Sequence, residues 1–149
     1  MDLDDTDRAI LRELQENART PFSEIARRID MSSATIHDRV KQLEEAGVIK
    51  GYHAAVDPAA LGYDVEAYVG LRVEQGATEA VLEALEEVEA VQEVALVTGE
   101  WDAIMTVVAG STDELRELLF EEIASIEGFD RSQTMVVLGH GIGDREIPV

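Results

Sequence analysis

Polar side chains that can bind nucleic acid are concentrated in one short segment of the chain, residues 32–42. Hydroxyl, amide, imidazole and guanidinium groups can reach base edges and phosphates in the major groove of duplex DNA. A solvated helix face is the alternative interpretation, because most polar stripes on helices are only that. The candidate DNA-binding residues are Ser32, Ser33, Thr35, His37, Asp38, Arg39, Lys41 and Gln42.

A second candidate site is the run Thr98, Gly99, Glu100, Trp101 and Asp102. Glycine lets a backbone approach a ligand, aspartate accepts hydrogen bonds from an ammonium group, and an indole offers an apolar wall or a cation-π face. An α-amino acid fits this chemistry. The alternative is a hairpin turn with a solvated Asp102, in which Trp101, the only tryptophan, packs a subunit contact.

Other kinds of chemistry lack the residues that they require. The chain has no cysteine, which excludes disulfides, thiolate nucleophiles and cysteine-ligated zinc. Its histidines lie far apart at His37, His53 and His140, and no carboxylate forms a recognisable pair with a nucleophile or base. We therefore expect no metal, no cofactor and no enzymatic activity. The glycine-alternating run 139–144 precedes no long helix that could hold a phosphate, so we interpret it as a mobile tail.

The DNA-binding candidates need a scaffold, and the first fifty residues predict a helix-turn-helix. Apolar spacing and capping residues indicate a helix over about 5–17, a second that begins with Thr20 as cap and Pro21 as first helical residue, and a third between Ser32 and Gly47. Only Asp30 and a methionine separate the second and third, so the two helices must cross steeply. Asp30 tolerates the left-handed backbone that such a turn requires.

The remaining sequence predicts an antiparallel sheet covered on one face. Strands are expected over 63–74, 91–98, 103–109 and 133–138, with helices over about 79–89 and 112–126. This order is a ferredoxin-like βαββαβ domain, so the fold class is α+β. A second copy laid sheet against sheet would bury the other face, and we therefore expect at least a dimer. The residues expected on that face are Tyr68, Thr106, Val108 and Val136.

The predicted organisation is a DNA-binding domain over 1–50, a linker strand and turn over 51–62, an oligomerisation and effector-binding domain over 63–140, and a C-terminal tail over 141–149. No run approaches the roughly 18 to 20 apolar residues of a membrane span, and the acidic N-terminus lacks the features of a signal peptide. We therefore expect a cytoplasmic protein without a membrane partner.

The net charge of −20 is unusual for a DNA-binding protein, because phosphates attract basic surfaces. Residues 1–50 carry 8 of the 12 Lys+Arg and 11 of the 32 Asp+Glu, or 8 − 11 = −3, so the rest carries 4 − 21 = −17. The chain has two lysines and ten arginines, and glutamates occur in most of the predicted helices. This composition is typical of proteins that stay hydrated in concentrated salt, so we expect a halophile's cytoplasm; an ordinary acidic protein is the alternative.

Three stretches resemble the Lrp/AsnC family of transcription regulators, also called leucine-responsive or feast/famine regulators, and we expect a haloarchaeal member. They are LDDTDRAILRELQENART from Leu3, the segment from Ser32 to Lys41, and RVKQLEEAGVIKGYHAAVDPAALGYD from Arg39. The resemblance implies a winged-type helix-turn-helix whose third helix contacts double-stranded DNA, and a linker strand near 48–56 that pairs across a homodimer. It also implies that dimers assemble into tetramers, octamers or open forms and that amino acids bind where dimers meet.

Within this resemblance, residues 98–102 match the family's effector loop, and Ser132 and Thr134 match positions where relatives carry hydroxyl groups near the pocket. The expected function is sequence-specific DNA-binding transcription regulation, modulated by an amino acid or similar small effector bound at the interface between dimers. The alternative is an effector-binding regulatory subunit that acts through protein contacts and not DNA. Replacing Arg39 with alanine is expected to discriminate them, because only a DNA-binding protein should lose operator binding.

Overall fold

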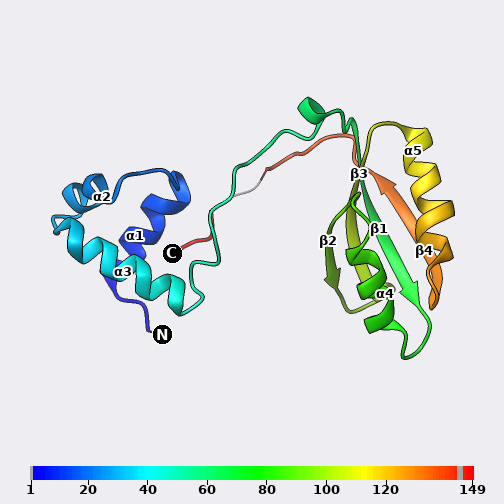
Figure 1. The fold of residues 1–149 in the computed structure, drawn as a ribbon, viewed down its shortest axis with the longest axis horizontal. Helices are drawn as coiled ribbons and strands as arrows, with labels where there is room; N and C mark the ends of the chain where they lie inside the picture. Colours follow the sequence, from blue (N-terminus) through cyan, green and yellow to red (C-terminus); the bar gives the residue numbers. More distant parts are fainter. Residues whose placement is uncertain (1, 144–145) are drawn as a thin grey trace. The chain divides into compact units, whose positions relative to one another are not determined.

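The computed structural model describes residues 2–143 and 146–149, which form two units (Figure 1). The N-terminal unit comprises the chain up to Ala55 together with Ile142–Val149, and the C-terminal unit comprises Val56–Gly141. The two hydrophobic cores share no residue. The chain therefore leaves the N-terminal unit through a linker and returns to that unit at its end. Over the described residues, no helix combines the length and the apolar character needed to cross a membrane.

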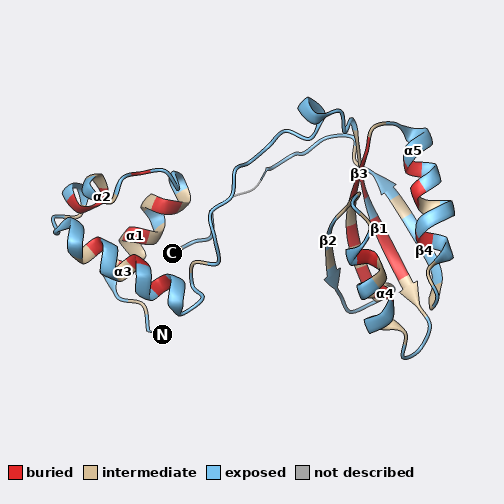
Figure 2. Cartoon of the chain, in the orientation of Figure 1, coloured by how far each residue is buried: buried red, intermediate tan, exposed pale blue. Residues whose placement is uncertain are grey.

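The N-terminal unit consists of α1 (Asp5–Glu16), α2 (Phe22–Arg28) and α3 (Ser33–Glu45), which confirms the predicted helix-turn-helix. The buried stripes of the helices meet in one small core (Figure 2). Burial of these stripes, rather than helix propensity, stabilises helices as short as α2. The core residues are Ile10, Leu14, Ile25, Ala26, Ile36, Val40 and Leu43.

The turn between α2 and α3 has the predicted geometry. Asp30 adopts the left-handed conformation, with a φ of 56°. Ser32 caps α3, since its Oγ accepts a hydrogen bond from the Thr35 N–H at 3.1 Å. The start of α2 was predicted wrongly by one residue. Pro21 has a ψ of 140° and is itself the N-cap, while Thr20 is buried before it and no side chain caps the helix.

The C-terminal unit has the predicted βαββαβ order. Its sheet is antiparallel, with strand order β2-β3-β1-β4. Side chains from one face of β1 and β3 form a core with α4 and α5, so both helices cover the same face. The bounds are β1 (Val65–Val73), α4 (Thr78–Glu86), β2 (Val91–Leu96), β3 (Ala103–Ala109), α5 (Thr112–Glu117) and β4 (Phe129–Val136).

Two elements of this unit differ from the prediction. The expected helix over 112–126 is α5 followed by a π-helical turn (Leu118–Glu122) and a 3-10 turn (Ile123–Ser125). Strand β4 begins at Phe129, not Gln133, after a turn in which Gly128 has a φ of 91°. Polar residues at the start of this edge strand concealed the alternation, because an edge strand carries charge on exposed positions. The earlier start brings Arg131 into the sheet, opposite Arg72.

The sheet face without helices carries three of the four residues predicted for it. Tyr68 pairs with Thr106 on one side and with Met135 on the other, and Val108 lies on the same face opposite Glu66. The placement of Val136 was wrong. Val136 pairs with Ala67 and therefore lies on the helix side of the sheet, since one step along a strand changes the face. Met135 occupies the open face instead.

The linker between the units begins as exposed, extended chain without regular structure at residues 51–57. A 3-10 turn (Ala59–Leu61) follows, and Gly62 closes it with a φ of 90°. A strand needs a partner for its main-chain groups. The predicted pairing of this linker across a dimer therefore stays a prediction.

Candidate DNA interface and effector loop

Arg39, one of the predicted DNA-binding residues, is an internal anchor of the helix-turn-helix. Its Nη1 lies 2.5 Å from Asp4 Oδ2 and 3.1 Å from Asp7 Oδ1. Asp7 is buried, and it forms a capping box with Asp4 in which each side chain accepts the other residue's main-chain N–H. Arg39 therefore joins the middle of α3 to the first turn of α1. In the described conformation the guanidinium of Arg39 is engaged in these two ion pairs, and contact of Arg39 with DNA stays a prediction.

The charged groups of this network shift the pKa values of Asp4 and Arg39. The Asp7 N–H, and then the guanidinium of Arg39, lower the pKa of Asp4 below its ordinary value of 3.8. The carboxylates of Asp4 and Asp7 in turn raise the pKa of Arg39. Asp4 and Arg39 are therefore both ionised at neutral pH.

The other candidates on α3 divide into two groups. Ser32 and Thr35 are used locally: Ser32 caps the helix, and the two hydroxyl oxygens are 2.7 Å apart. The remaining candidates lie on the exposed side of the helix, opposite the buried stripe. Ala34 lies on the same exposed side. These exposed candidates are Ser33, His37, Asp38, Lys41 and Gln42.

Within the exposed group, local contacts are weak. The His37 ring lies edge-on to Phe22 with 6.1 Å between centroids, and His37 Nδ1 is 3.7 Å from Asp38 Oδ1. Lys41 Nζ is 3.8 Å from Glu45 Oε1, and both side chains are about two-thirds exposed. Such exposed pairs contribute roughly 0 to 1 kcal/mol. These side chains can therefore exchange their present contacts for contacts with DNA.

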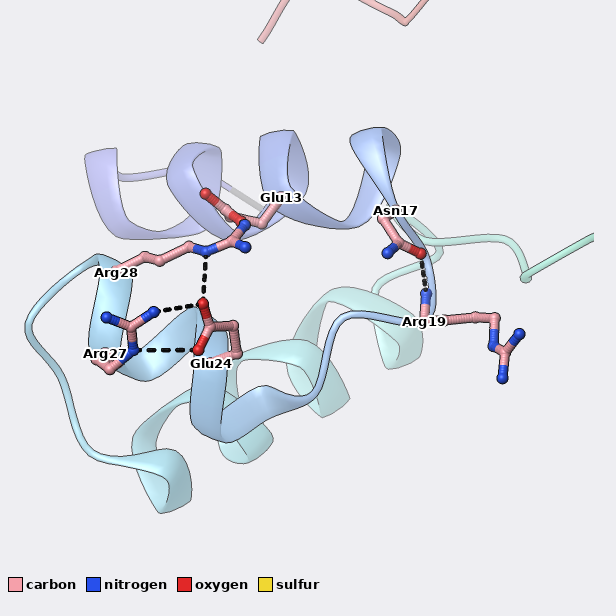
Figure 3. A network of polar contacts seen from close by, with 6 residues as sticks. All are labelled: Glu13, Asn17, Arg19, Glu24, Arg27 and Arg28. Carbon is pink, nitrogen blue, oxygen red and sulfur yellow. Dashed lines mark hydrogen bonds and ion pairs between the residues drawn. The ribbon is translucent and has the colours of Figure 1, made fainter.

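Cations elsewhere in the N-terminal unit are also held by acids. Arg27 and Arg28 both bond to Glu24, and Arg28 also bonds to Glu13 across to α1 (Figure 3). Of the eight cations in residues 1–50, four lie within 4.0 Å of a carboxylate among the described residues. Figure 3 shows the guanidinium of Arg19 pointing away from this cluster, and the Arg19 main-chain N–H donates to Asn17 Oδ1.

The linker begins with an anchor to α3. The Tyr52 hydroxyl donates to Glu44 Oε1 at 2.9 Å. Burial, followed by this hydrogen bond to a carboxylate, raises the pKa of Tyr52 to about 12. Tyr52 therefore stays protonated at any physiological pH and keeps its hydrogen bond to α3.

In the C-terminal unit, Trp101 lies on the open sheet face against the backbone of β1. A Cβ at Gly70 would come within 2.7 Å of the Trp101 ring. Gly70 lies between the inward-facing Val69 and Leu71, so the indole covers β1 on the side away from the helices. Glycine is required at this position because the ring occupies the place of a side chain.

Arg131 covers the indole and joins it to the loop. Its guanidinium carbon is 5.2 Å from the Trp101 ring centroid, within the range of a cation-π interaction. Its Nη2 is 3.5 Å from Glu100 Oε1, and Arg72 Nη1 donates to the Glu100 main-chain oxygen. Neither arginine was among the sequence candidates.

Asp102 has a structural role in addition to the ligand role that was predicted. Its Oδ2 accepts the N–H of Val73 at 2.9 Å, and its own N–H donates to the Leu71 oxygen. These bonds hold the loop on β1 beside the irregularity between Arg72 and Val73. Gly99, with a φ of 118°, provides the left-handed residue that the loop needs.

Ser132 and Thr134 do not join the Trp101 cluster. They pair with Leu71 and Val69, whose side chains face the helices, whereas Gly70 and Arg72 face the opposite side. The structure therefore brings together Gly99, Glu100, Trp101 and Asp102 and adds Gly70, Arg72 and Arg131. The isolated glycine in an alternating strand was the one sequence feature that indicated a close approach at Gly70.

Both units match known families. Residues 3–50 match the family of winged helix-turn-helix DNA-binding domains, and residues 66–146 match the Lrp/AsnC ligand binding domain. The chain is 35% identical over 147 residues to the HTH-type transcriptional regulator FL11 of Pyrococcus furiosus. The alignment covers 99% of this chain and 97% of the relative. This protein belongs to the Lrp/AsnC family.

Solved structures agree with this assignment. Escherichia coli AsnC shares 33% identity, with a TM-score of 0.91 and coverage of 97% of this chain and 98% of that one. A transcriptional regulator of Neisseria meningitidis in complex with L-Met shares 26% identity, with a TM-score of 0.93 and coverage of 99% and 97%. The Lrp/AsnC protein described here is thus a DNA-binding transcription regulator and not an enzyme.

Replacing Arg39 with alanine should destabilise the N-terminal unit by about 3 kcal/mol, because it leaves the buried Asp7 carboxylate without its cation. Denaturation followed by the circular dichroism signal of the helices measures this change in the free energy of unfolding. Arg27→Ala, which removes a cation from a mostly exposed pair, should change stability by less than about 1 kcal/mol. Equal unfolding midpoints for Arg39→Ala and the unmodified protein would contradict the anchoring role.

The free energy of unfolding of the N-terminal unit should also depend on pH. Because the pKa of Asp4 is lowered in the folded protein, its contribution to stability is present above its ordinary value of 3.8 and is lost as pH falls through the lowered value. Arg39→Ala should reduce this acid-dependent contribution.

Replacing Gly70 with alanine should displace the Trp101 ring, because the new Cβ would lie inside contact distance of the indole. We expect a loss of about 1 to 3 kcal/mol, as for other overpacked positions, and a red shift of the fluorescence of the only tryptophan. The control is Gly139→Ala, where no atom lies within 4 Å of the added Cβ. Unchanged emission in Gly70→Ala would disprove the packing of the ring on β1.

Proposed function

We propose that this Lrp/AsnC protein contacts its operator with the exposed face of α3, as a two-fold homodimer, and that an amino acid bound at the Trp101 loop modulates it. The observation that carries the DNA-binding part is the orientation of α3. Ile36, Val40 and Leu43 are buried while His37, Asp38 and Lys41 are exposed. A helix held in this way presents donors and acceptors to a groove without disturbing its own core.

The open sheet face supports the homodimer. Tyr68 and Met135, adjacent on neighbouring strands, are 38% and 43% exposed. A monomer would leave these apolar groups in water, whereas a second copy laid against them buries both sheets. Two α3 helices related by a two-fold axis would then contact two half-sites of the operator. Further assembly of dimers into tetramers or octamers belongs to the same proposal.

The effector loop supports an amino acid as the ligand. The Glu100 carboxylate and the Arg131 guanidinium are 3.5 Å apart and both more than half exposed. An α-amino acid carries an ammonium and a carboxylate on one carbon, so it can satisfy both groups by inserting between them. Ser132 and Thr134 remain proposed contacts that a neighbouring dimer would have to bring to the ligand. The structural neighbour in complex with L-Met makes methionine the first amino acid to test.

The charge distribution supports a cytoplasm rich in salt, as proposed for a halophile. The C-terminal part carries −17 of the net charge of −20, which keeps the surface hydrated at high ionic strength. Residues 1–50 carry only −3 and therefore repel a duplex less strongly.

Binding to a duplex from the protein's own promoter region tests the DNA-contact proposal. Lys41→Ala should weaken binding about tenfold, as expected for the loss of one groove or phosphate contact. Arg116→Ala, which removes an exposed cation from the C-terminal unit, is the matched control and should leave affinity unchanged. Affinity should also fall less steeply with added salt than for a basic repressor, because acids hold half of the cations of residues 1–50. Equal affinities of the two variants would argue against α3 as the contact surface.

Titration of Trp101 fluorescence with each of the twenty amino acids, L-methionine first, tests the effector proposal. A ligand at Glu100 and Arg131 should change the emission, because the guanidinium lies over the indole. Arg131→Ala should weaken that binding about tenfold, whereas Arg116→Ala should not. If no amino acid changes either the emission or the affinity for the promoter duplex, the effector proposal fails and DNA binding is unaffected.

A further inference from the structure

The last residues of the chain are bound to α1 through their main chain. Gln15 makes two hydrogen bonds to Ile147: its Nε2 donates to the Ile147 oxygen at 3.1 Å, and its Oε1 accepts the Ile147 N–H at 2.8 Å. One turn earlier on α1, Arg12 Nε donates to the main-chain oxygen of Val149 at 3.2 Å. The Ile147 side chain is 73% exposed. Helix α1 therefore recognises the backbone of this segment, and the side chain of Ile147 contributes little.

The bound segment forms one wall of an apolar cavity in the N-terminal unit. The cavity has a volume of about 440 Å³. Its other walls come from α1, through Leu11 and Leu14, and from the start of the linker, through Val48 and Ile49. The segment thus lies beside the α1 surface and the linker end at the same time.

This contact gives the N-terminal unit a second connection to the rest of the chain. The first is the linker that follows α3. The second leaves β4 at Val136 and rejoins the N-terminal unit from Ile142 onward. A unit held by one flexible linker explores a volume set by the linker's length, and a second attachment reduces that volume.

We propose that residues 146–149 are a latch that docks on α1 of their own chain and raises operator affinity by restricting the movement of the DNA-binding unit. The proposal rests on the proposed function, since it concerns an operator contacted by two α3 helices of a dimer. When one helix is bound, the effective concentration of the other depends on how freely its unit moves. The latch increases that concentration without contacting DNA.

Docking can be tested by cross-linking, because the chain has no cysteine of its own. Ala18 and Pro148 line the same cavity, so cysteines placed at both positions should be joined rapidly by a short bismaleimide. We expect the product to migrate as a single chain under denaturing conditions. A cross-linked dimer would show that the segment docks on the partner, and the absence of any product would show that it does not dock; either result overturns the proposal.

The effect on DNA binding is tested with variants of the latch and the protein's own promoter duplex. Gln15→Ala removes both bonds to Ile147, and Ile147→Pro removes the N–H that donates to Gln15. Each should weaken binding about fivefold. Ile147→Ala keeps the main-chain bonds and should bind as the unmodified protein does. Circular dichroism confirms that each variant is folded.

The outcomes separate this proposal from the proposed function. If the latch variants bind the duplex as tightly as Ile147→Ala does, the latch does not set affinity, and if they bind more tightly, the segment is inhibitory; both results overturn the proposal. If the unmodified protein binds no promoter duplex, the proposed operator contact fails and the affinity role of the latch fails with it. The cross-linking result still decides whether the segment docks.

Discussion

The position of α3 depends on one buried carboxylate. Asp7 lies inside the helix-turn-helix core, where an ionised group is unfavourable unless a cation and hydrogen bonds compensate it. Arg39 and the Asp4 N–H provide both. Apolar contacts between α1 and α3 tolerate small sliding movements better than this arrangement does, because a displacement would separate the Arg39 guanidinium from the buried Asp7 carboxylate. The pair therefore fixes the rotation of α3 about its axis and hence which residues face outward.

This constraint explains why acids and cations are so closely paired in the N-terminal unit. Arg39, the residue on α3 best suited to contact guanine, serves the fold, and Arg27 and Arg28 are held by Glu24. Added salt acts in two directions here. It weakens the attraction of DNA phosphates for free cations, but it also weakens exposed intramolecular pairs such as Arg27 with Glu24. A DNA-binding surface of this kind loses attraction and gains available cations as ionic strength rises, whereas a basic surface only loses attraction.

The elements that the sequence predicted well are those set by local rules. Ser32 as a cap, Asp30 in a left-handed turn and the alternation along β1 each depend on a few neighbouring residues, and all were confirmed. The contacts that the sequence did not predict involve partners distant in sequence. Arg39 and Asp7 are 32 residues apart and Trp101 and Gly70 are 31 apart, so no local pattern assigns these contacts. The prediction that Val136 lies on the open face was wrong for a related reason. The register of an edge strand with many polar residues cannot be deduced from its sequence pattern.

The Trp101 stack covers a position on the sheet that has no side chain of its own. A glycine in the middle of β1 leaves a strand without side-chain packing on one face. The indole fills that place, Arg131 lies over the indole, and Asp102 holds the loop by accepting the Val73 N–H. Because these contacts fall on β1, between β3 and β4, a displacement of the loop acts on the centre of the sheet and on the strand that leads to residues 142–149. The amino acid proposed as ligand, inserted between Glu100 and Arg131, would therefore act on the central strand of the sheet.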